Sequence, residues 1–113
     1  MRGLLNSSIN LSQITPVKFP ELLINLYSRQ TRLRFLQVQM NLEVFEEKDK
    51  DKVNTYKAFI TDSLIDITSN LTPAELNSVT GRILLETRIK NRVNEQLDHK
   101  LIKKIYFSKF IIQ

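Results

Sequence analysis

The sequence predicts an α+β fold, a small antiparallel sheet with two to three helices packed on one side. Residues in the first half alternate between apolar and polar, which is typical of strands, whereas the middle of the chain repeats apolar residues at helical spacing. The last twelve residues are strand-like again. Strands grouped before helices are typical of α+β proteins, and a length of 113 residues suits one domain.

Three strands are predicted in the first 45 residues. Residues 17–19 lie between Pro16 and Pro20, which favours a short edge strand. Residues 22–27 form the second strand, with Leu22, Ile24 and Leu26 on one face. The strongest signal is the unbroken alternation over residues 36–44, which predicts an antiparallel strand with one wet face. The apolar residues of this alternation are Leu36, Val38, Met40, Leu42 and Val44.

A charged block and a helix are predicted next. Residues 46–52 alternate in charge, which favours a solvated loop, and Asp49 or Asp51 is expected to cap the following helix. Apolar residues then recur at spacings of three and four, which predicts a helix whose left-handed C-terminal cap is Asn70. Its stripe, widened by Ala58 and Phe59, comprises Val53, Tyr56, Ile60, Leu64, Ile67 and Leu71.

A second helical region starts at a capping box. Thr72 is the predicted N-cap, Pro73 takes the first helical position, and Glu75 completes the box. Gly81 predicts a bend or a close packing contact between a short helix and a longer one. The longer helix is expected to end near His99, and its apolar residues are Ile83, Leu85, Ile89, Val93 and Leu97.

The segment 102–113 is predicted to be a strand with two apolar faces. One face carries Ile105, Phe107 and Ile111, and the other carries Tyr106, Phe110 and Ile112. A strand that is apolar on both faces belongs in the middle of a sheet or under a partner molecule.

Few residues are suited to catalysis. The absence of cysteine excludes disulfides, thiolate metal sites and thiol nucleophiles, and no phosphate-loop or hydrolase motif occurs. The single histidine, His99, is interpreted as a surface or capping residue, and Asp62 and Asp66 as part of a wet helix face. We therefore expect no enzyme activity, no cofactor and no metal.

Basic residues leave an alternative function open. The net charge is +5, and Arg29, Arg32 and Arg34 cluster at one turn. Residues 82–104 add seven basic side chains against three acidic ones. This pattern favours, as the alternative, a basic membrane-surface or nucleic-acid-binding module. No aromatic residue interrupts these bases to stack on nucleotides, and no apolar run is long enough for a transmembrane helix.

Several segments resemble the bacterial flagellar FliL family. Residues 105–113 match its closing pattern of hydrophobe-Tyr-Phe-Thr/Ser-x-Phe-hydrophobe-x-Gln, and residues 34–44 resemble its long strand. Residues 74–82 resemble its Leu-x-Ser/Thr-x-x-Gly-Lys/Arg turn, and Asn94 matches an asparagine late in the following helix. The resemblance runs from about residue 17 to residue 113, with the segments in the expected order.

The resemblance implies a non-enzymatic protein with a stomatin/prohibitin (SPFH)-like fold. Residues 17–113 are then the periplasmic domain of a single-pass inner-membrane protein at the flagellar basal body. Residues 1–16 are expected to be an arm or linker from a transmembrane helix that this sequence lacks. The expected partners are flagellar stator proteins of the MotA/MotB type or their sodium-driven equivalents, together with further copies in a homo-oligomeric ring. The expected role is to support stator assembly or torque generation, without nucleic acid.

A protein-contact surface is predicted at the closing strand or at the arginine turn, because exposed apolar groups in a row mark interaction sites. The candidate contact residues are Arg29, Arg32, Arg34, Tyr106, Phe110 and Ile112.

Overall fold

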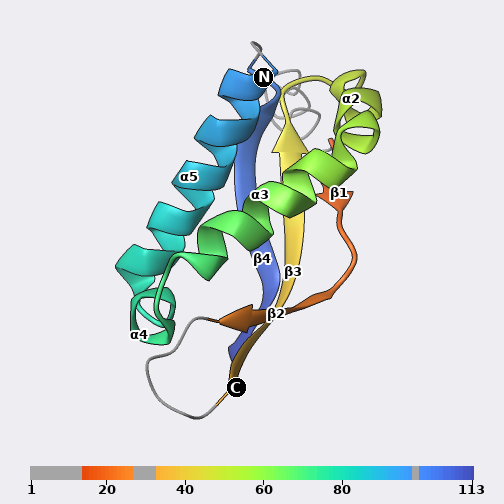
Figure 1. The fold of residues 1–113 in the computed structure, drawn as a ribbon. Helices are drawn as coiled ribbons and strands as arrows, with labels where there is room; N and C mark the ends of the chain where they lie inside the picture. Colours follow the sequence, from red (N-terminus) through yellow and green to blue (C-terminus); the bar gives the residue numbers. More distant parts are fainter. Residues whose placement is uncertain (1–13, 27–32, 98–99) are drawn as a thin grey trace, which may run out of the picture.

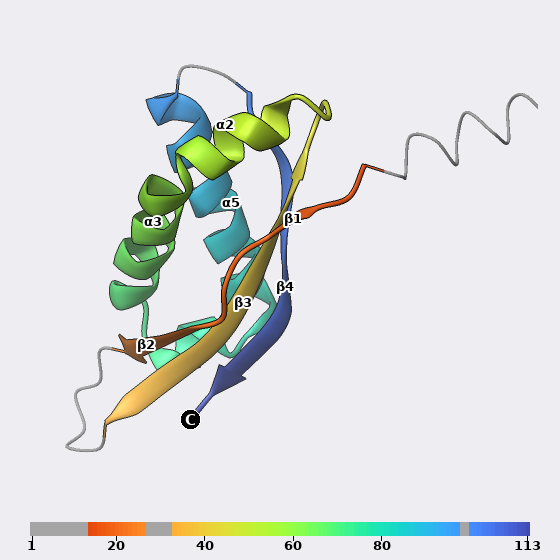
Figure 2. The ribbon, with the colours of Figure 1, turned by 90° about the vertical axis from the view of Figure 1, so that its right-hand side faces the viewer.

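The computed structural model describes residues 14–26, 33–97 and 100–113. They form a four-stranded antiparallel sheet whose helices all lie on one side, which confirms the predicted α+β fold (Figures 1 and 2). The elements are β1 (Val17–Lys18), β2 (Leu22–Leu26), β3 (Arg34–Val44), α2 (Asp49–Thr55), α3 (Lys57–Ser69), α4 (Pro73–Leu76), α5 (Val79–Gln96) and β4 (Ile102–Ile112).

The long strand β3 is the centre of the sheet. One of its edges pairs with β4, and the other pairs with β1 near Leu42 and with β2 near Val38. Between β1 and β2 the main-chain N–H of Phe19 still donates to Met40, at 2.9 Å, before Pro20 interrupts the ladder. The strands β1 and β2 therefore act as one broken edge strand, and the three predicted strands are confirmed.

The predicted faces of the closing strand are wrong, because β4 contains two irregularities in its register. Gln39 pairs with Lys109 and Met40 with Phe107, so Ser108 has no opposite residue on β3. Lys103 is likewise the extra residue between the pairs of Glu43 and Val44. Each extra residue reverses the side to which the following side chains point.

The bulges place the apolar residues of β4 mainly on the helix-covered face. Phe110 lies opposite buried Val38 and Ile112 opposite buried Leu36, whereas Ile111 pairs with Gln37 on the other face. The strand β4 is also at one edge of the sheet, not in its middle. The helix-facing residues of β4 are Ile102, Ile105, Phe107, Phe110 and Ile112.

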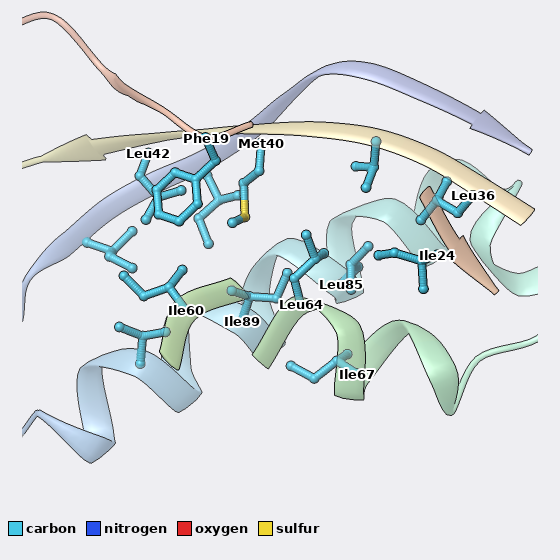
Figure 3. Close-up of a cluster of buried hydrophobic side chains, with 14 of the residues drawn as sticks. Phe19, Ile24, Leu36, Met40, Leu42, Ile60, Leu64, Ile67, Leu85 and Ile89 are labelled. Atoms are coloured by element: carbon cyan, nitrogen blue, oxygen red, sulfur yellow. The ribbon is translucent and has the colours of Figure 1, made fainter. Parts of the chain in front are cut away.

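The core lies between β3 and the two long helices (Figure 3). The alternate residues of β3 are buried, as the sequence predicts, and Phe19 covers the core from the β1–β2 junction. The facing residues are Ile60, Leu64 and Ile67 on α3, with Leu85, Ile89 and Val93 on α5.

The first predicted helix is in fact two helices. The charged block is only partly a loop, because α2 begins at Asp49, after an N-cap, Lys48, that makes no side-chain capping bond. The two acids of the first turn therefore do not cap the helix, although their charge favours its N-terminus. The chain turns at Tyr56, which is 42% exposed, so its predicted place in the apolar stripe is wrong. Ala58, which is predicted to widen that stripe, is exposed too.

The end of α3 also differs from the prediction. Asn70 is the C-cap, but its φ of −97° is not left-handed. Its side-chain Nδ2 donates to the carbonyl of Asp66 at 2.9 Å, and its main-chain N–H donates to Ile67. The last carbonyls are thus satisfied without the unusual backbone conformation.

The α4–α5 junction confirms two predictions. Thr72 Oγ1 accepts from the N–H of Glu75, and the Glu75 carboxylate accepts from the N–H of Thr72, which completes the capping box. Gly81 lies in the first turn of α5 and is buried against the carbonyl of Glu75, so it makes the predicted close contact.

One apolar residue of α5 is misplaced by the prediction. Ile83 is 57% exposed. It precedes buried Leu85 by two residues, which is roughly 200° around a helix.

Candidate contact surface

The face of the sheet without helices is the first part of the candidate contact surface, and we call it the open face. Figure 2 shows that the helices all lie on the opposite side. Its central residues come from β2, β3 and β4 and are Leu23, Gln37, Gln39, Asn41, Tyr106, Lys109 and Ile111.

A hydrogen-bonded polar network occupies the middle of the open face. Gln37 accepts from Gln113 Nε2 at 3.1 Å and donates to the carboxylate of Glu21. Lys109 Nζ lies 3.1 Å from the same carboxylate. The hydrogen bond from Lys109, and then that from Gln37, lower the pKa of the Glu21 carboxyl. The polar side chains in this part of the open face therefore already have hydrogen-bond or ion-pair partners within the domain.

The bulge residue belongs to a second group of hydrogen bonds. Ser108 Oγ donates to Gln39 Oε1 at 3.1 Å, and Gln39 Nε2 donates to the carbonyl of Phe19 at 3.1 Å. The bulge in β4 is thus linked across β3 to the broken edge strand.

Two exposed apolar side chains flank the polar network around Gln37. Leu23 is 64% exposed and Ile111 is 45% exposed, and both lie opposite Gln37, one on each side. Tyr106 lies further along β4, opposite Asn41, and is half-buried. Partial burial, and to a lesser extent the charge of Glu43, raise the pKa of the Tyr106 hydroxyl. Apolar side chains on a solvated face are suited to contact with another protein.

The free edge of β4 is the second part of the surface. Within the described residues, β4 pairs only with β3, so its other edge carries backbone groups without a strand partner. The strand is 11 residues long. Such an edge can accept a strand from another chain through main-chain hydrogen bonds.

The structure does not gather the predicted contact residues into one patch. Arg29 and Arg32 lie outside the described residues. Arg34 starts β3, and seven residues of strand, about 23 Å, separate it from Asn41, the residue opposite Tyr106. Phe110 and Ile112 are half-buried on the helix side.

Two of the predicted contact residues have structural roles. The guanidinium of Arg82 lies 4.5 Å from the centre of the Phe110 ring. The centres of the Phe110 and Phe107 rings are 5.2 Å apart. Arg34 Nε donates to the main-chain oxygen of Gln113 at 3.0 Å. Both interactions hold the end of β4 to the rest of the domain.

Two residues that match the FliL sequence pattern, Gln113 and Asn94, also hold β4 in place. Gln113 exchanges two main-chain hydrogen bonds with Phe35, of 2.8 and 3.1 Å, and so extends the β3–β4 ladder. Asn94 Oδ1 accepts from the N–H groups of Leu101 and Ile102, both at 3.0 Å, and its Nδ2 donates to the carbonyl of Ile102. This side chain therefore fixes the start of β4 against α5.

The acidic pair on α3 points to solvent. Asp62 and Asp66 are exposed, and Asp66 pairs with Arg92 on α5 at 2.6 Å. No group of three or more possible metal ligands occurs in the described parts of the chain, and His99 lies outside them. Among the described helices, none has the length and apolar character needed to cross a lipid bilayer.

Comparison with known proteins identifies the family. The family model described as "Flagellar basal body-associated protein FliL" matches residues 17–113, from β1 to the residue after β4. This chain belongs to the FliL family. The matched range contains the capping box, the Gly81 contact, the Asn94 side chain and the closing Gln113.

A curated relative bears the same family name, and the match covers little more than half of that relative. The "Flagellar protein FliL" of Aquifex aeolicus (strain VF5) is 27% identical over 94 residues, which is 83% of this chain. The matched part is 58% of that relative's length. Membership of FliL therefore associates the chain with the flagellar basal body.

The sequence did not single out Leu23 or the free edge of β4. Leu23 had a signal, since it alternates with the predicted core residues Leu22 and Ile24. The free edge had none, because strand order is not visible in local periodicity.

Proposed function

We propose that this chain is a non-enzymatic scaffold domain of the flagellar motor, which associates with stator units and supports their assembly or torque generation. Membership of the FliL family over residues 17–113 is the observation that carries the proposal. The domain's surface adds support, since it offers an exposed sheet face and a free strand edge for protein contacts.

The proposed location is the periplasm, in a protein that a single N-terminal helix anchors in the inner membrane. The support is the resemblance of the sequence to periplasmic domains of that kind. Residues 1–16 are then the arm that joins the domain to its anchor, and residues 17–113 are the periplasmic domain. Stator proteins of the MotA/MotB type or their sodium-driven equivalents are the proposed partners.

The proposed contact surface is the open face together with the free edge of β4. Tyr106 stays a candidate there, and Leu23 and Ile111 join it because they are exposed on the same face. Phe110 and Ile112 are set aside because they pack toward the helices. We propose that a second copy or a stator segment covers this surface when copies are concentrated in the membrane.

The decisive experiment is gene deletion in the source bacterium, followed by complementation. Swimming in normal and viscous media and recruitment of fluorescent stators are measured with the wild-type gene and with Ile111→Glu. Ile83→Glu is the matched control, because Ile83 is also an exposed isoleucine but lies on α5. We expect Ile111→Glu, but not the control, to impair swimming under load.

Two results separate the parts of this proposal. If the deletion strain swims and recruits stators as the parent does, the motor role is wrong. If the deletion has an effect but both variants restore full swimming, the motor role stands and the contact surface lies elsewhere.

A further inference from the structure

One end of the molecule gathers lysines from elements that are separate in sequence. Where β3 ends, a hollow of about 470 Å³ is lined by Phe45 and by the side chains of Lys90, Lys100 and Lys103. Lys90 comes from α5, Lys100 from the connection to β4, and Lys103 from the second bulge of β4. A bulge commonly re-aims a side chain, and here the extra residue is one of the lysines. We call this region the lysine end.

The lysines of this end are not neutralised by neighbouring acids. Within the described residues, Lys90, Lys100 and Lys103 take part in no ion pair. Among the residues that the structure describes, Glu95 is the one carboxylate that lines the hollow, so the described lining carries three positive charges against one negative.

The next acids along the chain are already engaged. Glu46 pairs with Lys48 at 3.3 Å and Glu47 pairs with Lys50 at 2.8 Å. These two carboxylates directly follow Phe45, yet each is offset by its own partner. The excess of positive charge at the hollow is therefore not cancelled by this turn.

The helix dipole of α5 does not account for Lys90. Cations are favoured within the last turn of a helix, but Lys90 lies more than one turn before the last residue, Gln96. A ligand for the unpaired ammonium groups explains the cluster better.

An exposed aromatic side chain stands among the charges. Phe45 is 48% exposed at the rim of the hollow, directly after the last residue of β3. Cations around an exposed aromatic ring are the composition of surfaces that lie against a bilayer, where the ring enters the headgroup layer and the ammonium groups meet phosphates.

The path of the chain gives the same orientation. The strand β1 runs antiparallel to β3, with Val17 opposite Leu42. Because the two strands are antiparallel, the N-terminal end of β1 lies beside the C-terminal end of β3, which leads to Phe45. The first described residues, 14–16, therefore lie on the side of β1 that is nearer the lysine end.

We propose that the lysine end binds the anionic phospholipid headgroups of a bilayer, so that this end of the domain lies against the membrane surface. The proposal rests on the side chains of the hollow. It agrees with the N-terminal anchor of the proposed function but does not depend on it.

Vesicle flotation with the 113-residue chain tests the proposal. Vesicles of phosphatidylcholine with phosphatidylglycerol are compared with vesicles of phosphatidylcholine alone. We expect binding to the anionic vesicles only, and weaker binding as the salt concentration rises. Each lysine near an anionic surface contributes to affinity, and the double variant Lys100→Gln/Lys103→Gln should lower the partition coefficient roughly 30-fold.

The matched control is Arg34→Gln/Lys109→Gln, which removes the same charge elsewhere. Arg34 starts β3 and lies about 33 Å along the strand from Val44, and Lys109 is paired with Gln39, about 16 Å along the strand from Val44. This control should lower binding by less than about 3-fold, because both charges lie further from the lysine end than a Debye length of about 10 Å. Phe45→Ser should weaken binding without lowering the melting temperature, since the ring is exposed.

Several outcomes overturn the proposal. Absence of binding to anionic vesicles shows that the lysine end is not a lipid surface, and equal binding to both vesicle types shows that charge is not the cause. Equal losses in the two double variants show that only net charge matters. None of these outcomes touches the motor role, which the deletion experiment tests separately.

Discussion

Replacing Gly81 by alanine should destabilise the domain, although alanine is the better helix former. A Cβ atom on Gly81 falls 1.7 Å from the main-chain oxygen of Glu75 and 2.7 Å from its carbonyl carbon. The same Cβ lies 2.9 Å from Ser78 Oγ, the N-cap group that accepts from the N–H of Gly81. Main-chain atoms cannot move aside as a flexible side chain can, so α4 and α5 must separate.

The expected magnitude follows from three contributions. Overpacking of a tight contact costs about 1–3 kcal/mol. Loss of the Ser78 cap costs about 1 kcal/mol more, and the higher helix propensity of alanine returns about 1 kcal/mol. The net loss is about 2 kcal/mol, which corresponds to a fall in melting temperature of about 10 °C for a domain of this size.

Urea and thermal unfolding followed by circular dichroism measure this loss. Thr80→Ala is the control, since Thr80 is the exposed neighbour of Gly81 in the same turn of α5. It should change the unfolding free energy by less than about 0.5 kcal/mol. A Gly81→Ala protein as stable as the wild type would refute the reasoning, because it would mean that the two helices are not held at this distance.

Three further predictions concern the core, the start of β4 and the open face. Leu64→Ala should lower the unfolding free energy by about 2–5 kcal/mol, measured in urea, because a buried side chain is replaced by a cavity. Asn94→Ala should cost about 2–3 kcal/mol, because it leaves main-chain groups without partners, and hydrogen exchange at the Leu101 amide should accelerate. The lowered pKa of Glu21 gives stability that is present above its unfolded pKa and is lost as the pH falls through the folded value. Lys109→Met should raise the Glu21 pKa toward its ordinary value in an NMR titration.

The first two of these predictions each have a control variant. Gln39→Ala should cost about 1 kcal/mol, less than Leu64→Ala, because Gln39 makes hydrogen bonds on the open face but fills no core volume. Asn91→Ala leaves the α5–β4 connection intact, since Asn91 is exposed on the same helix. Equal costs within either pair, or an unchanged Glu21 pKa in Lys109→Met, would contradict the assignments.

The elements that the sequence determined are those in which a local repeat meets no interruption. The nine-residue alternation around Met40 predicts β3 correctly because every second side chain of an uninterrupted strand faces the core. The capping box of Thr72 and Glu75 is equally local, since its partners are three residues apart. The family was visible too, because Gly81, Asn94 and Gln113 each have a contact that a motif can record.

The tertiary structure decided everything that depends on pairing between distant segments. Ser108 and Lys103 become bulges only because β4 must follow β3, so the faces of Phe110, Ile111 and Ile112 cannot be read from a two-residue period. Local periodicity also does not specify that β4 is an edge strand. The open face around Ile111 and the lysines that meet near Phe45 follow from that arrangement. A repeat encodes which residues share a side of one element, whereas the surface of the domain depends on which elements lie side by side.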